Sequence, residues 1–189
     1  MERSEKTVNA ISEDTCRHWY VAIVATNSEK ACRDRLVALG HEAWVASQEE
    51  MRVWRNGRRS TVERVVIPLM VFVHATEQER RDIVNLPFIK YFLTDKAGRA
   101  NDFGVHPVAV IPQREMEKLQ FMLYQNDQPV TFLSRPLKAG GSVRVIRGSL
   151  RGLEAQVTRY RDGDTYLVVN VGMLGCAMVR IALSDVEPL

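Results

Sequence analysis

The chain has 189 residues, of which 46% are hydrophobic and 26% are charged, and its formal net charge is +3. These values are typical of one or two globular domains, and so weak a positive charge does not by itself indicate a nucleic-acid-binding protein. No apolar run approaches the roughly 20 residues that span a bilayer, and residues 1–15 lack the apolar core of a secretion signal. We therefore expect a cytoplasmic protein with no membrane partner.

Catalytic and metal-binding patterns are missing from the sequence. The three cysteines, Cys16, Cys32 and Cys176, are far apart and form no CxxC pair, and the four histidines are scattered. There is no nucleophile elbow, phosphate-binding glycine loop or HExxH motif. The sequence predicts no metal, no cofactor and no enzymatic activity, and an enzyme with an unrecognised site is the least supported alternative.

The first elements have a βαβ-like order. Residues 18–25 are aromatic and β-branched, which predicts a buried strand. A helix over 28–39 follows, with Thr26, Asn27 or Ser28 as its cap and Gly40 at its end. A second strand is expected within residues 41–47.

Residues 51–64 are typical of a β-hairpin arm. Asn56–Gly57 predicts a type I′ turn between two short strands. The arm carries one acid, Glu63, and five arginines: Arg52, Arg55, Arg58, Arg59 and Arg64. Such a cluster suits phosphate contact, or it keeps an exposed hairpin soluble, and we favour phosphate contact.

Residues 65–73, VVIPLMVFV, form the most hydrophobic run and predict a strand. Pro68 cannot donate to a β-ladder, so we expect it at an edge or a bulge. The period of two places Pro68, Met70 and Phe72 on one face and Ile67, Leu69 and Val71 on the other. Both faces are apolar, which fits either burial on both sides or a face that binds a partner.

The next segments alternate between helix and short strand. Thr76 and Glu79 form a capping-box pattern that predicts a helix over 76–84. A short strand is expected within 86–93. Residues 108–111 lead to Pro112, and a helix is expected over 113–124 with an apolar stripe at Met116, Leu119, Met122 and Leu123. Residues 126–138 contain two prolines and no periodicity, so we place a linker and the domain boundary there.

The last third of the chain has the pattern of a small β-barrel. Alternating apolar residues in 142–146 and 153–158 flank Gly148 and Gly152, a spacing that predicts a tight loop. Further strands are expected over 165–171 and 177–183. This strand–glycine loop–strand stretch resembles the KOW motif, and a generic small barrel is the alternative.

The order of all these segments resembles the NusG family of transcription elongation factors over residues 17–189. The resemblance implies an α+β protein with an N-terminal NGN domain over 17–125, in which helices flank an antiparallel-rich sheet. A linker over 126–138 and a small SH3-like KOW β-barrel over 139–189 follow. We expect this barrel to be stable in the free protein because its strands are rich in β-branched residues.

Two departures from the family pattern indicate a specialised paralogue. Ile67–Pro68–Leu69–Met70 stands where the family usually has an aromatic, a proline, a glycine or asparagine and a tyrosine. Leu174 stands where the loop usually has an aromatic residue. The details are most similar to the UpxY-type antiterminators, which promote transcription of long surface-polysaccharide operons.

The resemblance also implies a mechanism and its residues. The NGN domain would bind the β′ clamp helices of RNA polymerase and favour processive elongation through Ile23, Ile67, Pro68, Met70, Phe72, Met116 and Leu119. Arg55, Arg58 and Arg59 would lie toward non-template or upstream DNA. Met173 and Leu174 would meet a small-subunit ribosomal protein or Rho.

An RNA-binding or ribosome-associated KOW protein is the alternative function. It would use Arg144, Arg147 and Arg151, and its RNA affinity would depend steeply on salt. The segment from Ala139 onward carries six basic and five acidic residues, a weak electrostatic signature, so we rank this alternative second.

Overall fold

The computed structural model describes residues 16–135, 137, 140–159 and 163–189. The chain divides into two compact units. The first unit comprises Met1–Val45 and Pro68–Gln113, and the second comprises Ala46–Ile67 and Arg114–Leu189. No helix in the described ranges is both long and apolar enough to cross a bilayer.

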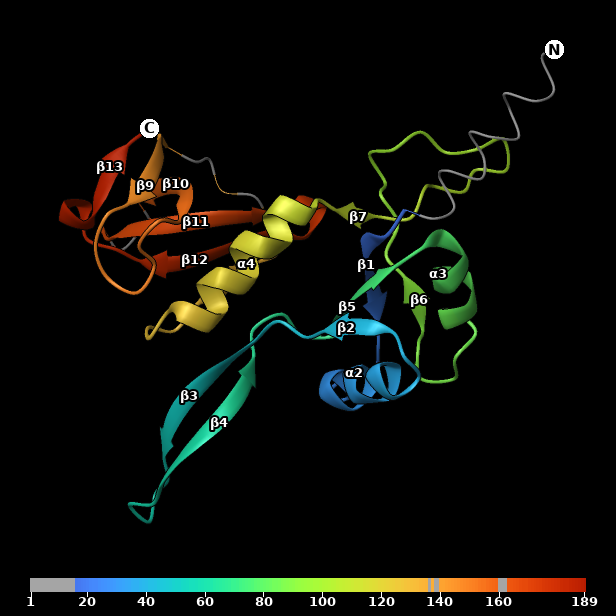
Figure 1. The fold of residues 1–189 in the computed structure, drawn as a ribbon, viewed down its shortest axis with the longest axis horizontal. Coiled ribbons are helices and arrows are strands. Elements are labelled where there is room, and N and C mark those ends of the chain that lie inside the picture. Colours follow the sequence, from blue (N-terminus) through green and yellow to red (C-terminus); the bar gives the residue numbers. More distant parts are fainter. Residues whose placement is uncertain (1–15, 136, 138–139, 160–162) are drawn as a thin grey trace. The chain divides into compact units, whose positions relative to one another are not determined.

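The first unit is built on an antiparallel sheet with strand order β2-β5-β1-β6, in which β7 also pairs with β1 (Figure 1). Its strands are β1 (His18–Ile23), β2 (Glu42–Trp44), β5 (Met70–Ala75), β6 (Tyr91–Phe92) and β7 (Val110–Ile111). Helix α2 (Glu29–Ala38) lies beside β2 and β5, and α3 (Glu77–Ile83) lies beside β5. The strand expected within 86–93 is thus reduced to two residues.

The helix signals in the sequence are confirmed with one difference. In α3, Thr76 Oγ1 accepts from the Glu79 amide at 3.2 Å and Glu79 Oε2 accepts from the Thr76 amide at 2.8 Å, which is a complete capping box. In α2, Ser28 occupies the N-cap position but makes no side-chain cap. Its hydroxyl instead donates to the Ala25 carbonyl at 2.6 Å.

The prediction of one strand over 65–73 is wrong. Strand β4 (Arg59–Val65) ends at Val65, a turn occupies residues 66–69, and β5 begins at Met70. Leu69 adopts a left-handed φ of 68°, and its amide donates to the buried carboxylate of Glu29 at 2.7 Å. Because the pleat is interrupted, Pro68 does not continue the face formed by Met70 and Phe72.

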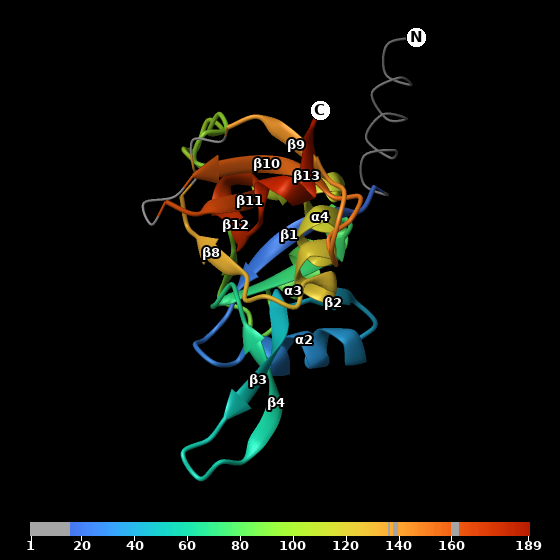
Figure 2. The same cartoon turned by 90° about the vertical axis from the view of Figure 1, so that its left-hand side faces the viewer.

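The second unit contains a hairpin, a helix and a six-stranded antiparallel sheet. The hairpin is formed by β3 (Ser47–Val53) and β4 (Arg59–Val65), and it projects from the rest of this unit (Figure 2). Helix α4 (Gln113–Gln125) buries the predicted stripe of Met116, Leu119, Met122 and Leu123. The sheet has the order β13-β9-β10-β11-β12-β8. Its strands are β8 (Thr131–Leu133), β9 (Ser142–Val145), β10 (Glu154–Arg159), β11 (Thr165–Val171), β12 (Gly175–Arg180) and β13 (Val186–Pro188).

Part of the expected linker belongs to this sheet. Thr131–Leu133 forms β8, which pairs with Cys176–Met178 of β12. Gly175 lies so close to β8 that a Cβ on it would stand 1.9 Å from the Leu133 carbonyl oxygen. Gly175 is therefore required for this approach of the two backbones.

The predicted glycine loop between β9 and β10 is confirmed. Gly148 and Gly152 have φ angles of 83° and 91°, which other residues rarely adopt. A Cβ at either glycine would meet no atom within 4 Å. The two glycines therefore serve a sharp reversal of the backbone and not a close approach to another segment.

Candidate functional site

The tip of the β3–β4 hairpin is closed by a three-residue loop. Trp54 N donates to Arg58 O at 2.8 Å, and Gly57 N donates to Trp54 O at 2.8 Å. Gly57 has a φ of 78°, whereas Asn56 is not among the residues with positive φ. The predicted type I′ turn, which needs positive φ at both residues, is therefore wrong, and the geometry is that of a type I turn followed by a left-handed glycine.

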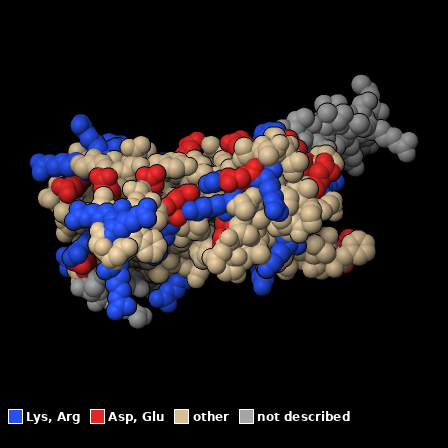
Figure 3. Space-filling view, turned by 90° about the horizontal axis from the view of Figure 1, so that it is seen from below, with Lys and Arg blue, Asp and Glu red and all other residues tan. Residues whose placement is uncertain are grey.

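The structure brings three of the five predicted arginines together at this tip. Arg55, Arg58 and Arg59 are exposed, and their guanidinium groups form no ion pair with any residue in the described ranges. Arg64, farther down the hairpin, is paired with Glu50 at 2.8 Å. Figure 3, viewed from the side toward which the hairpin points in Figure 1, shows basic side chains over the hairpin end. The tip thus offers unneutralised cations to an anion.

The base of the hairpin is fixed by a buried amide. Gln48 donates to the carbonyl oxygens of Asn126 at 2.9 Å and Gln128 at 2.8 Å, and its Oε1 accepts from the Val130 amide at 2.9 Å. Arg64 donates to the Val130 carbonyl at 3.0 Å. These bonds hold the strands at one end and leave the tip to project.

Helix α4 is linked to the C-terminal sheet by charged groups. Glu154 of β10 pairs with Arg144 at 2.8 Å and with Arg114 of α4 at 3.3 Å. The hydrogen bond from Arg144 lowers the pKa of Glu154, and the same bond raises the pKa of Arg144. Arg144 also lies 3.7 Å from Glu187, so two carboxylates already neutralise one of the three arginines of the RNA-binding alternative.

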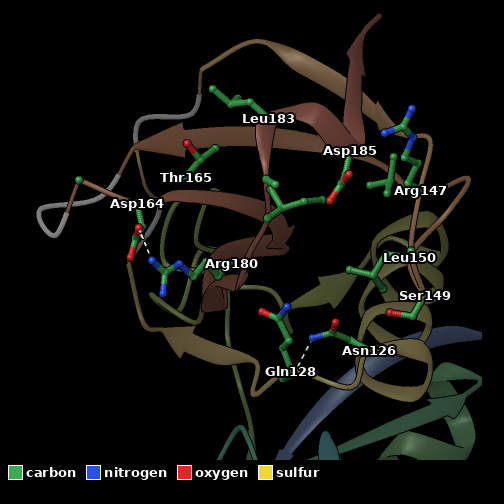
Figure 4. Close-up of a pocket in the computed structure, with 15 residues that line it drawn as sticks. Asn126, Gln128, Arg147, Ser149, Leu150, Asp164, Thr165, Arg180, Leu183 and Asp185 are labelled. Atoms are coloured by element: carbon green, nitrogen blue, oxygen red, sulfur yellow. Dashed lines mark hydrogen bonds and ion pairs between the residues drawn. The ribbon is translucent and has the colours of Figure 1, made fainter.

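A cavity of about 560 Å³ opens beside the glycine loop (Figure 4). It is lined by Arg147, Ser149 and Leu150 of that loop and by Arg180 and Asp164, which form an ion pair. The lining holds no cluster suited to a metal, and no group of three His, Cys, Asp or Glu side chains that could hold one occurs in the residues described.

Comparison with known proteins assigns the family. Residues 17–120, more than half of the chain, match the family model for NusG, described as transcription termination factor nusG. The chain belongs to the NusG family.

Solved structures and curated proteins complete the comparison. The structure described as domain interaction in Thermotoga maritima NusG has a TM-score of 0.45 and 16% identity, covering 92% of this chain and 97% of that chain. Conformation A of the MjSpt4:Spt5 complex has a TM-score of 0.28 and 13% identity, covering 90% and 97% of the two chains. No curated protein matches the sequence.

Most of the apolar residues predicted to bind polymerase are buried in this NusG-family protein. Ile23, Ile67, Phe72, Met116 and Leu119 are each at most 8% exposed. Pro68 is exposed and Met70 is half-buried, directly across the ladder from Ile23. The accessible part of the predicted set is therefore the end of the β4–β5 turn.

The predicted partner loop is the short 3₁₀ helix η1 (Gly172–Leu174). Met173 is 42% exposed, whereas Leu174 is buried at 6%. The Gly172 amide donates to the carboxylate of Glu115 on α4. Of the two predicted residues, only Met173 presents its side chain to a partner.

Sequence reasoning missed three residues that shape these surfaces: Gln48, Trp54 and Glu115. The polar Gln48 gave no sign of burial, and the contact of Glu115 with Gly172 joins segments far apart in the chain. Trp54 could have been found from the sequence, because a large apolar side chain in an arginine-rich, exposed hairpin is a candidate for ligand binding.

Proposed function

We propose that this NusG-family protein is a specialised transcription antitermination factor that binds RNA polymerase and promotes processive elongation. The observation that carries the proposal is the family match over residues 17–120. The departures at residues 67–70 and at Leu174 support a paralogue of the UpxY type, which acts in the cytoplasm on long surface-polysaccharide operons. It needs no cofactor or reaction of its own, because a bound protein can act by shifting the population of polymerase states.

The polymerase contact is centred on Pro68 and Met70. Both side chains are accessible, and the turn that holds them is fixed by the bond from Leu69 to Glu29 and by the bond from Val24 N to Leu69 O at 3.0 Å. An apolar edge on a fixed turn suits the surface of the β′ clamp helices. The other predicted residues, Ile23, Ile67, Phe72, Met116 and Leu119, are buried, so the proposed contact is made by Pro68 and Met70.

The remaining surfaces have separate roles in this proposal. Arg55, Arg58 and Arg59 contact non-template or upstream DNA, supported by their lack of ion pairs within the described ranges. Met173 binds a small-subunit ribosomal protein or Rho, and its exposure supports this role.

Binding to a reconstituted elongation complex tests the proposal. Wild type should bind and shorten pauses in run-off transcription, and Met70→Asp should lose about tenfold or more in affinity because a charge would be buried at the contact. Leu39→Asp is the matched control, since Leu39 is an exposed apolar residue in the same unit and should bind like wild type. Circular dichroism of both variants checks that the fold is retained.

The result that overturns the proposal is a wild-type protein that binds neither the elongation complex nor one that carries its loading DNA. Equal binding by wild type and Met70→Asp would remove Met70 from the site. RNA binding that is lost in Arg147→Gln and Arg151→Gln, without polymerase binding, would instead support the RNA-binding alternative.

A further inference from the structure

One face of the hairpin tip carries an exposed aromatic ring among cations. Trp54 is 47% exposed, and its indole N–H donates to Ser60 Oγ at 3.0 Å. The strand register sets Arg52 opposite Ser60, and the loop sets Trp54 opposite Arg58. Because side chains alternate along a strand, these four residues share one face.

The indole ring is held in place and not merely exposed. The bond to Ser60 fixes its edge, and the guanidinium carbon of Arg52 lies 5.7 Å from the ring centroid. A large apolar ring normally finds cover in a folded protein. The plane of the Trp54 ring is fixed by these two contacts, yet nearly half of the residue's surface is exposed to solvent.

A hollow of about 420 Å³ lies against this ring. It is lined by Trp54, Asn56, Arg58 and Ser60. Asn56 Oδ1 accepts from the Arg58 amide at 3.1 Å, which directs the side chain of Asn56 toward this corner of the loop. The lining therefore combines an aromatic plane with amide and guanidinium donors, the groups that bind the faces and edges of nucleobases.

The charge around the hollow favours a polyanion. Arg52, Arg55, Arg58 and Arg59 lie within eight positions of one another, and none forms an ion pair with a residue of the described segments. The nearby carboxylates are already engaged, Glu50 with Arg64 at 2.8 Å and Glu63 with Ser47 at 2.5 Å. A partner that brings both negative charge and an aromatic face fits this tip better than an apolar protein surface does.

We infer that the hairpin tip binds an unpaired nucleotide of single-stranded nucleic acid. The base stacks on Trp54 and is contacted at its edge by Asn56 and Arg58, while Arg55 and Arg59 contact the flanking phosphates. A base inside a duplex offers no free face, so the site selects single strands. This inference deepens the proposed contact between the hairpin and nucleic acid and rests on that part of the proposed function.

Fluorescence anisotropy with labelled 12-nucleotide strands tests the inference. The probes are oligo(dT), oligo(U), a duplex of mixed sequence with each of its separated strands, and a strand of the same length in which every nucleotide is abasic. Single strands should bind more tightly than the duplex. Trp54→Ala should lose about tenfold on oligo(dT), as expected for removal of one stacked base, and Trp54→Phe should keep most of the affinity.

The abasic strand separates stacking from a purely structural role of Trp54. It keeps the phosphates but offers no base, so wild type and Trp54→Ala should bind it alike. Arg55→Gln should weaken binding to every strand and lower the salt dependence by about one counterion. A preference for oligo(dT) or for oligo(U) supports the inference and tells which kind of strand is bound.

Three results would overturn the inference. They are equal affinity for duplex and single strands, wild-type binding by Trp54→Ala, and an equal loss by Trp54→Ala on the intact and abasic strands. The Met70→Asp variant keeps this inference apart from the polymerase contact. It should bind oligo(dT) like wild type whether or not it binds the elongation complex.

Discussion

The backbone amide of Val130 donates to the side-chain carbonyl of Gln48 at 2.9 Å. The same side chain donates to the carbonyl oxygens of Asn126 and Gln128, so one buried amide satisfies three backbone groups of the segment that follows α4. Burial of a polar group is tolerated only when such bonds are complete. Gln48 therefore fixes the base of the hairpin to a segment far away in the sequence.

We predict that Gln48→Leu destabilises the protein. The substitution leaves the Val130 amide and the Asn126 carbonyl without their partner, while the Gln128 carbonyl keeps its bond of 2.6 Å from the Asn126 side chain. A cost of about 2–3 kcal/mol is expected. Urea unfolding and amide hydrogen exchange at Val130 measure the effect. Gln78→Leu is the control because Gln78 is exposed on α3, and a loss no larger than that of the control would contradict the role assigned to Gln48.

Thr76→Ala should cost about 1 kcal/mol of unfolding free energy, because the Glu79 amide loses its cap. Thr76→Ser keeps the hydroxyl and should cost only a few tenths of a kcal/mol. Thermal unfolding of the two variants provides the comparison, and equal losses would show that the methyl group and not the hydroxyl matters.

The capping box also predicts a pH dependence. The hydrogen bond from the Thr76 amide lowers the pKa of Glu79 below its ordinary value of 4.5. A carboxylate with a lowered pKa in the folded state stabilises the protein above its unfolded pKa, and this stabilisation is lost as the pH falls through the folded pKa. The stability difference between wild type and Glu79→Gln should therefore be complete at pH 7 and shrink below about pH 5. A stability difference between the two proteins that stays constant with pH would contradict this role of the Glu79 carboxylate.

Two glycines should respond differently to a methyl group. Gly148→Ala should cost about 1–2 kcal/mol, because only the left-handed backbone is strained and the space beside it is empty. Gly175→Ala should cost more, since its Cβ would overlap the Leu133 carbonyl oxygen and force β8 away from β12. Urea unfolding ranks the two, and faster exchange of β8 amides in Gly175→Ala alone would identify the cause.

The three thiols should react at different rates. Cys16 is exposed, whereas Cys32 and Cys176 are buried. Burial also raises the pKa of Cys176, which lowers its thiolate fraction at neutral pH. With a thiol reagent at pH 7.5, one thiol should react quickly and two only on unfolding. Cys16→Ser should abolish the fast phase, and a fast phase that persists in this variant would contradict the assignment.

The features that the sequence predicted well depend on residues close together in the chain. The capping box joins Thr76 to Glu79, and the reversal at Gly148 and Gly152 is encoded in a single loop. The buried apolar stripe of helix α4 could also be predicted, because 3.6-residue periodicity is a local pattern. In each of these three cases, the types and spacing of neighbouring residues are sufficient to predict the local structure.

The features that were missed depend on distant partners. Leu69 takes its left-handed conformation with its amide bonded to Glu29, and Thr131–Leu133 is a strand because Cys176–Met178 offers it a ladder. At the hairpin tip the turn residues were recognised, but the loop length was set by the pairing of Trp54 with Arg58. The candidate arginines were found from composition, whereas the fixed ring of Trp54 required the structure.

The place of β8 at the edge of the C-terminal sheet has a consequence for synthesis of the protein on the ribosome. Strands β9 to β12 pair with their neighbours in chain order, but β8 emerges first and pairs with β12, nearly the last strand to appear. Contacts between distant segments form slowly, because a long loop must close before they are made. Until Cys176 has been synthesised, the Thr-Phe-Leu segment of β8 has no ladder to join. While residues 134–176 are being synthesised, the nascent chain therefore carries a strand segment without its ladder partner, which exposes it to association with other chains.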